Sequence, residues 1–119
     1  RLRRHQAAPV ILFSRGVHHS LEQQAESGVS ALGVDWTFDL GDVRTRVAGQ
    51  VALEGNLDPC MLYADEGRIR EEVRRMLASY SGDSAEPGYI VNLGHGVLPD
   101  TDPEKAKAFV RAVKEESVG

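Results

Sequence analysis

The sequence contains a single cysteine, Cys60, among its 119 residues. One cysteine excludes an intrachain disulfide and any zinc motif built on a cysteine pair, and it agrees with a reducing compartment. No apolar run approaches the roughly 20 residues that cross a bilayer, and the basic residues 1–5 lead into an apolar stretch too short for a signal peptide. We therefore expect neither membrane insertion nor a targeting segment.

An excess of positive charge is also missing. The 14 Lys and Arg residues face 18 Asp and Glu residues, so the formal net charge is −4 and there is no basic footprint for nucleic acid. The sequence lacks a Gly-x-Gly-x-x-Gly motif after a strand, a Walker loop and a nucleophile elbow, which removes the support for nucleotide binding or serine hydrolysis. The apolar and charged fractions, 41% and 27%, are those of an ordinary globular domain.

Short β-rich apolar runs alternate with helix-forming segments along the chain. The predicted strands are residues 9–13, 31–36, 50–55 and 89–93, and the predicted helices are residues 20–26, 40–48, 66–80 and a last one that starts at Pro103. Ser20 and Asp102 are predicted N-caps, and Gly28 and Gly49 are predicted stops. A polar, glycine-containing loop is expected at residues 81–88.

The alternation predicts the α/β class, with a parallel sheet and right-handed crossovers. Residues 9–13 read as a strand buried on both faces. The third helix carries one predicted apolar stripe, formed by Ile69, Val73, Met76, Leu77 and Tyr80. On the last helix, Phe109, Val110 and Val113 are predicted to face inward.

Four βα units fit either a small doubly wound sheet or half of an eight-unit barrel. The chain begins without an initiator Met, in a charged segment that resembles the end of a helix, which favours half of a (β/α)8 barrel made of four consecutive units. Polar side chains follow each predicted strand: Ser14 and Arg15, then Asp35, then Asn56 and Asp58, then His95. Both folds bind ligands at that end of the strands, so these residues locate a site in either fold.

His95 is the sharpest candidate, because it lies between two glycines just past a strand in NLGHG (residues 92–96). Bare backbone on both sides lets a ligand approach the imidazole, although a histidine that bonds its own loop is the commoner outcome. Asn56 and Asp58 could receive substrate or could close a turn before Pro59. Asp35 could serve in acid–base chemistry or could cap the loop that follows it.

Two further histidines, His18 and His19, follow the first predicted strand without an acidic or cysteine partner at metal spacing. They read as loop histidines, one of which could line the mouth of a barrel. No metal site is expected.

Three segments taken together, GVDWT (residues 33–37), GNLDPC (residues 55–60) and NLGHG (residues 92–96), resemble the C-terminal half of uroporphyrinogen decarboxylase in their order and spacing. The resemblance runs from about residue 9 to residue 113. It also takes in LYA (residues 62–64) and PDTDP (residues 99–103).

This resemblance implies a cytosolic, homodimeric enzyme of haem (porphyrin) biosynthesis. Such an enzyme converts uroporphyrinogen III into coproporphyrinogen III by decarboxylating four acetate side chains, without a metal or organic cofactor. The family's histidine in the NLGHG turn corresponds to His95, which is expected to bind a substrate carboxylate or transfer a proton. Asp35 and Asn56 are weaker substrate-binding candidates that shape the pocket. The family's aspartate and arginines come from the N-terminal half, so residues 1–119 are expected to form the C-terminal half-barrel and to be inactive alone.

Two alternatives remain open. The chain could be a non-catalytic half-barrel that pairs with a second copy, or a relative of zinc-dependent methyltransferases, which the lone Cys60 disfavours. Three departures from the family pattern are Glu54, where the family often has Gln, Lys114, where a histidine is common, and Gly67, which weakens a predicted helix by about 1 kcal/mol.

Overall fold

The computed structural model describes residues 8–16, 18–47, 49–80 and 88–117. The basic start, Ala48 and nearly all of the loop predicted at residues 81–88 lie outside the described residues. The elements, in chain order, are β1 (Ile11–Phe13), η2 (His18–Ser20), α1 (Leu21–Ala25), β2 (Ala31–Gly33), α2 (Leu40–Val47), β3 (Ala52–Leu57), η3 (Pro59–Tyr63), α3 (Glu66–Tyr80), β4 (Tyr89–Leu93) and α4 (Pro103–Glu116).

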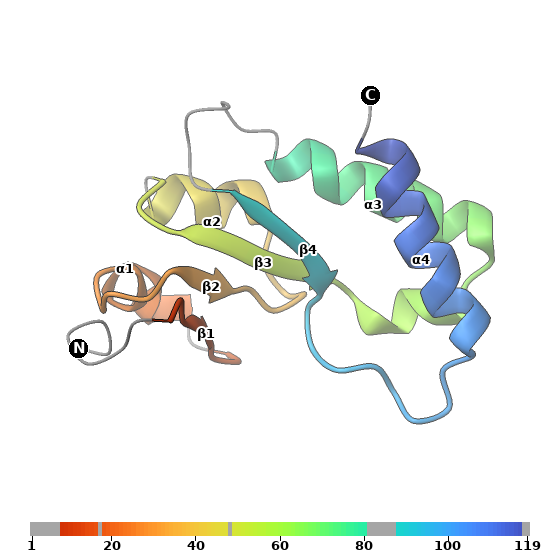
Figure 1. Ribbon diagram of the computed structural model, residues 1–119, viewed down its shortest axis with the longest axis horizontal. Helices are drawn as coiled ribbons and strands as arrows, with labels where there is room; N and C mark the ends of the chain where they lie inside the picture. Colours follow the sequence, from red (N-terminus) through yellow and green to blue (C-terminus); the bar gives the residue numbers. More distant parts are fainter. Residues whose placement is uncertain (1–7, 17, 48, 81–87, 118–119) are drawn as a thin grey trace.

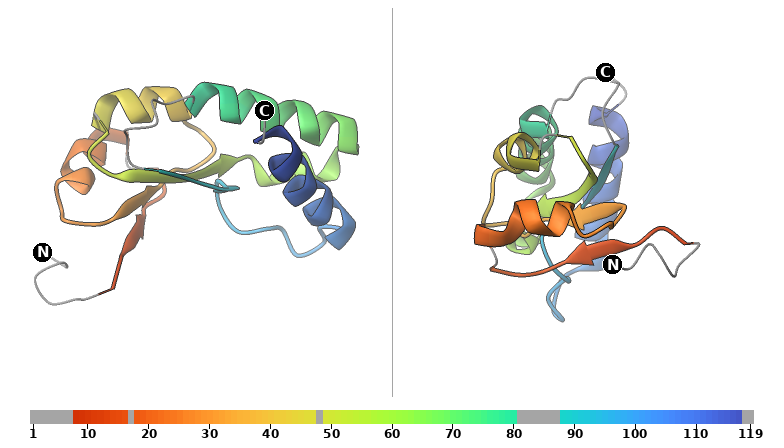
Figure 2. Two further views of the ribbon diagram at one scale, coloured as in Figure 1. Left: turned by 45° about the horizontal axis from the view of Figure 1, so that its top comes forward. Right: turned by 90° about the vertical axis from the view of Figure 1, so that its left-hand side faces the viewer.

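The strands form one parallel sheet with the order β1-β2-β3-β4, so each strand pairs with its neighbours in sequence. α1, α2 and α3 lie along one face of this curved sheet, and α4 packs beside α3 (Figures 1 and 2). A doubly wound sheet reverses its strand order and carries helices on both faces, whereas a barrel keeps sequential order with helices outside. The predicted α/β class and the arrangement of four consecutive barrel units are confirmed.

The hydrophobic core lies between the sheet and the helices. Leu32 and Leu53 on the sheet are 0% and 1% exposed, and Val43 of α2 is 0% exposed. The stripe predicted for α3 is confirmed, since Ile69, Val73 and Met76 are buried while Leu77 and Tyr80 pack partly buried against the core. The sheet face that meets the helices is the outer face of the barrel segment.

The opposite face, which we call the inner face, is open. The prediction that the first strand is buried on both faces is wrong, because Ile11 and Phe13 are 49% and 46% exposed. Ile90 on β4 is 44% exposed on the same face. Burial of a parallel strand on both faces requires a covering layer on each side, and the described helices supply one layer.

The prediction that Val110 faces inward on α4 is also wrong, since Val110 is 49% exposed. Successive helical residues are about 100° apart, so an arc centred between Phe109 and Ala112, which also takes in Ala108, turns Val110 away from the core. Val113 packs partly buried against the core as predicted.

The ends of several elements differ from the predictions. The second strand ends at Gly33, three residues early, and β3 runs two residues further than predicted, to Leu57. Ser20 precedes α1, but its side chain makes no capping bond to the helix backbone. The predicted stops Gly28 and Gly49 are confirmed by φ values of +92° and +68°.

Candidate functional site

The turn that carries His95 follows β4 and is anchored to the neighbouring strands. The Gly94 amide donates a hydrogen bond of 2.7 Å to the Leu57 carbonyl at the end of β3. Gly94 also packs against Trp36, since a Cβ on Gly94 would lie 2.3 Å from the backbone nitrogen of Trp36. This close approach requires glycine, because real Cβ atoms do not come so near a backbone atom.

The imidazole of His95 is half-buried, and its Nδ1 lies 2.8 Å from the Gly96 carbonyl oxygen. A carbonyl oxygen accepts, so this contact requires the proton on Nδ1. Nε2 is then the nitrogen through which the ring can act, as an acceptor when neutral and as a donor when charged. The loop bond expected of an ordinary histidine is present, and it leaves the second nitrogen for a ligand.

His95 lines a cavity of about 310 Å³ on the inner face of the sheet. Phe13, Glu54, Asn92 and Val97 share this cavity with His95. These residues come from β1, β3, β4 and the turn after β4, so the parallel sheet gathers them at one place.

Asp35 is 3% exposed and serves as a loop clamp. Its Oδ2 accepts from the Gly16 amide at 3.1 Å, and its Oδ1 accepts from the amide of Thr37 at 2.7 Å and from the hydroxyl of Thr37. Asp35 therefore joins the loop after β1 to the loop after β2, as the capping interpretation expects.

Asn56 is a second buried clamp, 8% exposed. Its Nδ2 donates to the carbonyl oxygens of Asp35 and Phe38 at 3.0 and 2.6 Å. The structure thus brings Asn56 and Asp35 together. Asn56 lines a different cavity from His95, one of about 320 Å³ between the loop before α2, the loop after β3, and α3.

The turn interpretation of Asp58 is confirmed, since its Oδ1 accepts from the Cys60 amide at 2.9 Å at the start of η3. Desolvation and the nearby Asp58 carboxylate raise the pKa of the Cys60 thiol, which disfavours the thiolate that a metal would need. The described residues hold no group of three or more His, Cys, Asp or Glu side chains placed for a metal ion. Within the same residues, no helix is long and apolar enough to cross a membrane.

Sequence reasoning missed the inner-face residues Phe13, Glu54 and Asn92 as members of the site. Period-two alternation along each strand was the signal that could have found them. It also missed Tyr63, whose hydroxyl donates to the Asp100 carboxylate and ties η3 to the loop between His95 and α4. That bond raises the pKa of Tyr63.

Comparison with known proteins gives concordant results. The family model described as "Uroporphyrinogen decarboxylase (URO-D)" matches residues 1–116. Proteins named uroporphyrinogen decarboxylase are 53% identical over 99% of this chain in Teredinibacter turnerae and 55% identical over 90% of it in Saccharophagus degradans. A solved methyltransferase from Methanosarcina mazei is 21% identical with a TM-score of 0.74 and shows a shared fold; the match covers 92% of this chain and 32% of that one.

The chain spans 33% and 29% of the length of the two decarboxylases it matches. The family match nonetheless extends over almost the whole chain and includes the turn that carries His95. The sheet order, the helix placement and these identities agree, and the chain belongs to the uroporphyrinogen decarboxylase (URO-D) family.

Proposed function

We propose that the complete gene product decarboxylates the four acetate side chains of uroporphyrinogen III to give coproporphyrinogen III in porphyrin biosynthesis. The observation that carries the proposal is the His95 ring, which lines the inner-face cavity with Nδ1 held by Gly96 and Nε2 available. Membership in the family supplies the substrate class.

The chemistry can proceed without an added electron sink. Protonation of a pyrrole ring makes a cation, and the electrons of the breaking carbon–carboxylate bond neutralise it as carbon dioxide leaves. The acetate methylene then takes up a proton and becomes a methyl group, while the ring releases the proton it gained, so that one proton is consumed for each carbon dioxide released. The protein must supply a proton donor and a negative group facing the pyrrole, both placed in advance.

Within this chain, charged His95 donates from Nε2 to a substrate carboxylate, and neutral His95 accepts a proton there. Asp35 and Asn56 contribute by holding the loops after β1, β2 and β3 in place, and so shape the pocket. Arg15 is exposed at the end of β1, where a cation can meet a carboxylate. The remaining length seen in the relatives, in this proposal, completes the barrel and supplies the other cations.

The test is His95→Asn in the complete gene product, assayed for coproporphyrinogen formation. Loss of one positioned proton-transfer or carboxylate-binding group should lower kcat/KM by about 100-fold, with an unchanged circular dichroism spectrum. His19→Asn, at an exposed position in η2, is the matched control and should retain full turnover. Unchanged turnover of His95→Asn would refute the role of His95, and absence of turnover in the unmodified protein would refute the proposed function.

One alternative is favoured by a specific observation, the exposure of Ile11, Phe13 and Ile90 on the inner face. A stand-alone half-barrel could cover this face by pairing with a second copy. Mass spectrometry of the intact gene product distinguishes the stand-alone half-barrel from the complete enzyme. A mass near 13.0 kDa supports the stand-alone chain, and a mass about three times larger supports the complete enzyme. Sedimentation that shows a stable 13.0 kDa monomer would contradict the paired version.

The proposal also includes a homodimer in the cytosol, which the family resemblance implies. Sedimentation of the complete gene product at twice its monomer mass is the expected result. Binding of one equivalent of zinc would instead favour the methyltransferase-like alternative.

A further inference from the structure

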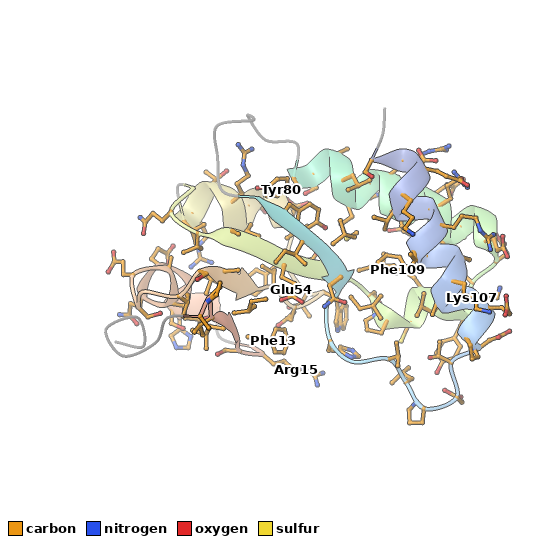
Figure 3. All side chains as sticks on the ribbon, in the orientation of Figure 1. Phe13, Arg15, Glu54, Tyr80, Lys107 and Phe109 are labelled. Carbon is orange, nitrogen blue, oxygen red and sulfur yellow. The ribbon has the colours of Figure 1, made fainter. Side chains whose placement is uncertain are left out.

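The cavity of about 320 Å³ that Asn56 lines is on the helix side of the sheet, and we call it the helix-side cavity. The His95 cavity is on the other side. In Figure 3, Phe13 and Glu54, which line the His95 cavity, lie on one side of β3, and α2 lies on the other. None of the described residues lines both cavities. Since sites for small molecules begin at about 300 Å³, the helix-side cavity is large enough to hold a ligand of its own.

Asn56 offers this cavity a hydrogen-bond acceptor. It is 8% exposed, and its Nδ2 donates to the carbonyl oxygens of Asp35 and Phe38. Carbonyl oxygens only accept, so these two bonds require the amino group on their side and place Oδ1 on the opposite side. No described residue donates to Oδ1. Because a buried acceptor without a donor is unfavourable, Oδ1 favours a ligand that carries an N–H or O–H group.

The same cavity has surfaces suited to a flat ring. Trp36 lines it and is 41% exposed. Met76 lines it as well, and its sulfur accepts from the Asn56 amide at 3.3 Å, so the thioether lies next to the residue that offers the acceptor. Aromatic faces and thioethers both make favourable contacts with aromatic rings. A ligand that donates to Asn56 can therefore pack an aromatic ring on these side chains.

The charged groups that line the helix-side cavity have a negative sum. Among the described residues they are three carboxylates and two guanidinium groups, those of Asp39, Asp58, Glu72, Arg68 and Arg75. Glu72 Oε1 lies 2.9 Å from a guanidinium nitrogen of Arg68 and 2.9 Å from one of Arg75. One carboxylate therefore holds both cations.

The two aspartates are bonded by neutral donors instead. Asp39 accepts from the Ser79 hydroxyl at 2.7 Å, and this bond lowers the pKa of Asp39. Asp58 accepts from the Cys60 amide through Oδ1. Within the described part of the chain, neither aspartate forms an ion pair with a cation. A positively charged ligand is therefore stabilised in this cavity, and a negatively charged one is disfavoured.

We propose that the helix-side cavity binds a planar organic cation, an aromatic ring that carries an amidinium or a similar positive group with N–H donors. The positive group donates to Asn56 Oδ1 while the ring packs on Trp36. The carboxylates of Asp39 and Asp58 balance the charge. Uroporphyrinogen carries many carboxylates and has the wrong charge for this cavity, so the inference does not rest on the proposed function.

The test uses three probes of nearly equal shape, benzamidine, benzamide and benzoate. Benzamidine is a cation with donors on both nitrogens, benzamide is neutral with one donor group and one acceptor, and benzoate is an anion with acceptors alone. Each probe is titrated into the complete gene product at neutral pH, and binding is followed by ligand-observed NMR. Benzamidine should bind about tenfold more tightly than benzamide, the difference between a charged and a neutral hydrogen bond, and benzoate should not displace it.

Three variants locate the bound probe. Asp58→Asn keeps an acceptor for the Cys60 amide and removes one charge, so it should weaken benzamidine binding about tenfold and leave benzamide binding unchanged. Trp36→Leu removes the aromatic face and should weaken the binding of both by about fivefold. Glu54→Gln, in the His95 cavity, is the matched control and should bind benzamidine as the unmodified protein does.

No binding of benzamidine, or its displacement by benzoate, would overturn the proposal. So would a benzamidine affinity that Asp58→Asn and Trp36→Leu both leave unchanged. A loss of affinity in Glu54→Gln alone would place the probe in the His95 cavity and would also overturn it. Circular dichroism checks that each variant folds, and if Trp36→Leu does not fold, Asp58→Asn decides alone. None of these outcomes depends on turnover of uroporphyrinogen.

Discussion

Single residues decide where the His95 imidazole can be. Gly94 places its backbone against Trp36, with no room for a Cβ. A Cβ on Gly96 would have no described atom within 4 Å, apart from those of its chain neighbours. The two glycines that flank His95 therefore have different roles. Gly94 seats the turn on the loop after β2, while Gly96 provides the carbonyl that holds Nδ1 of His95.

Replacing Gly94 by Ala should displace the His95 turn, because the methyl group would meet backbone atoms of Trp36. Overpacking of this kind costs about 1–3 kcal/mol of unfolding free energy, and turnover should fall as His95 moves. Gly96→Ala is the matched control and should change stability by less than about 0.5 kcal/mol. Denaturant unfolding and turnover of both variants in the complete gene product check this, and equal effects of the two would contradict it.

At the scale of elements, the junction of β3 and β4 is held by the partly buried phenol of Tyr89. The Tyr89 hydroxyl donates to the Gly55 carbonyl at 2.5 Å, and its ring stacks on Tyr80 at the end of α3 with centroids 4.6 Å apart. Burial raises the pKa of Tyr89 above its ordinary value. This one side chain links a strand to both its neighbouring strand and the helix layer.

Tyr89→Phe should lower the unfolding free energy by about 1 kcal/mol at neutral pH, because the Gly55 carbonyl loses its donor. The raised pKa adds a pH dependence of known sign. The folded state keeps the phenol proton to higher pH than the unfolded state. The contribution of the Tyr89 phenol to the unfolding free energy is therefore complete below about pH 10, the unfolded pKa, and is lost as pH rises beyond it.

Unfolding measured from pH 7 to 11 should therefore show a steeper alkaline decline in the unmodified protein than in Tyr89→Phe. Tyr63, whose pKa is raised by its bond to Asp100, contributes a decline that both proteins share. Identical slopes above pH 10 would contradict the assignment to Tyr89.

The whole molecule has two sheet faces of different character (Figure 2). The outer face buries Leu32 and Leu53 under helices, while the inner face leaves Phe13 and Ile90 about half exposed and carries Glu54 among them. In a closed barrel such side chains form the interior layers. The inner face of this chain therefore has the composition of a barrel interior near its ligand-binding end.

If the complete gene product closes the barrel over this face, Ile90→Asp should destabilise it by about 2–4 kcal/mol, because the carboxylate would replace a buried side chain. Chemical denaturation of the complete gene product measures the change. Glu71→Ala, on the exposed side of α3, is the control and should have little effect. An unchanged unfolding free energy in Ile90→Asp would show that the inner face stays open to solvent.

The sequence by itself determined the order and type of the elements, because periodic apolar residues and the stops Gly28 and Gly49 act locally. It also determined the family and the prominence of His95, since both depend on short contiguous motifs. The tertiary structure alone decided that Asp35 and Asn56 clamp loops, that Val110 points outward, and that Phe13, Glu54 and Asn92 share the His95 cavity. These outcomes depend on strand register and on which face the helices cover, and both are set by packing between segments far apart in sequence.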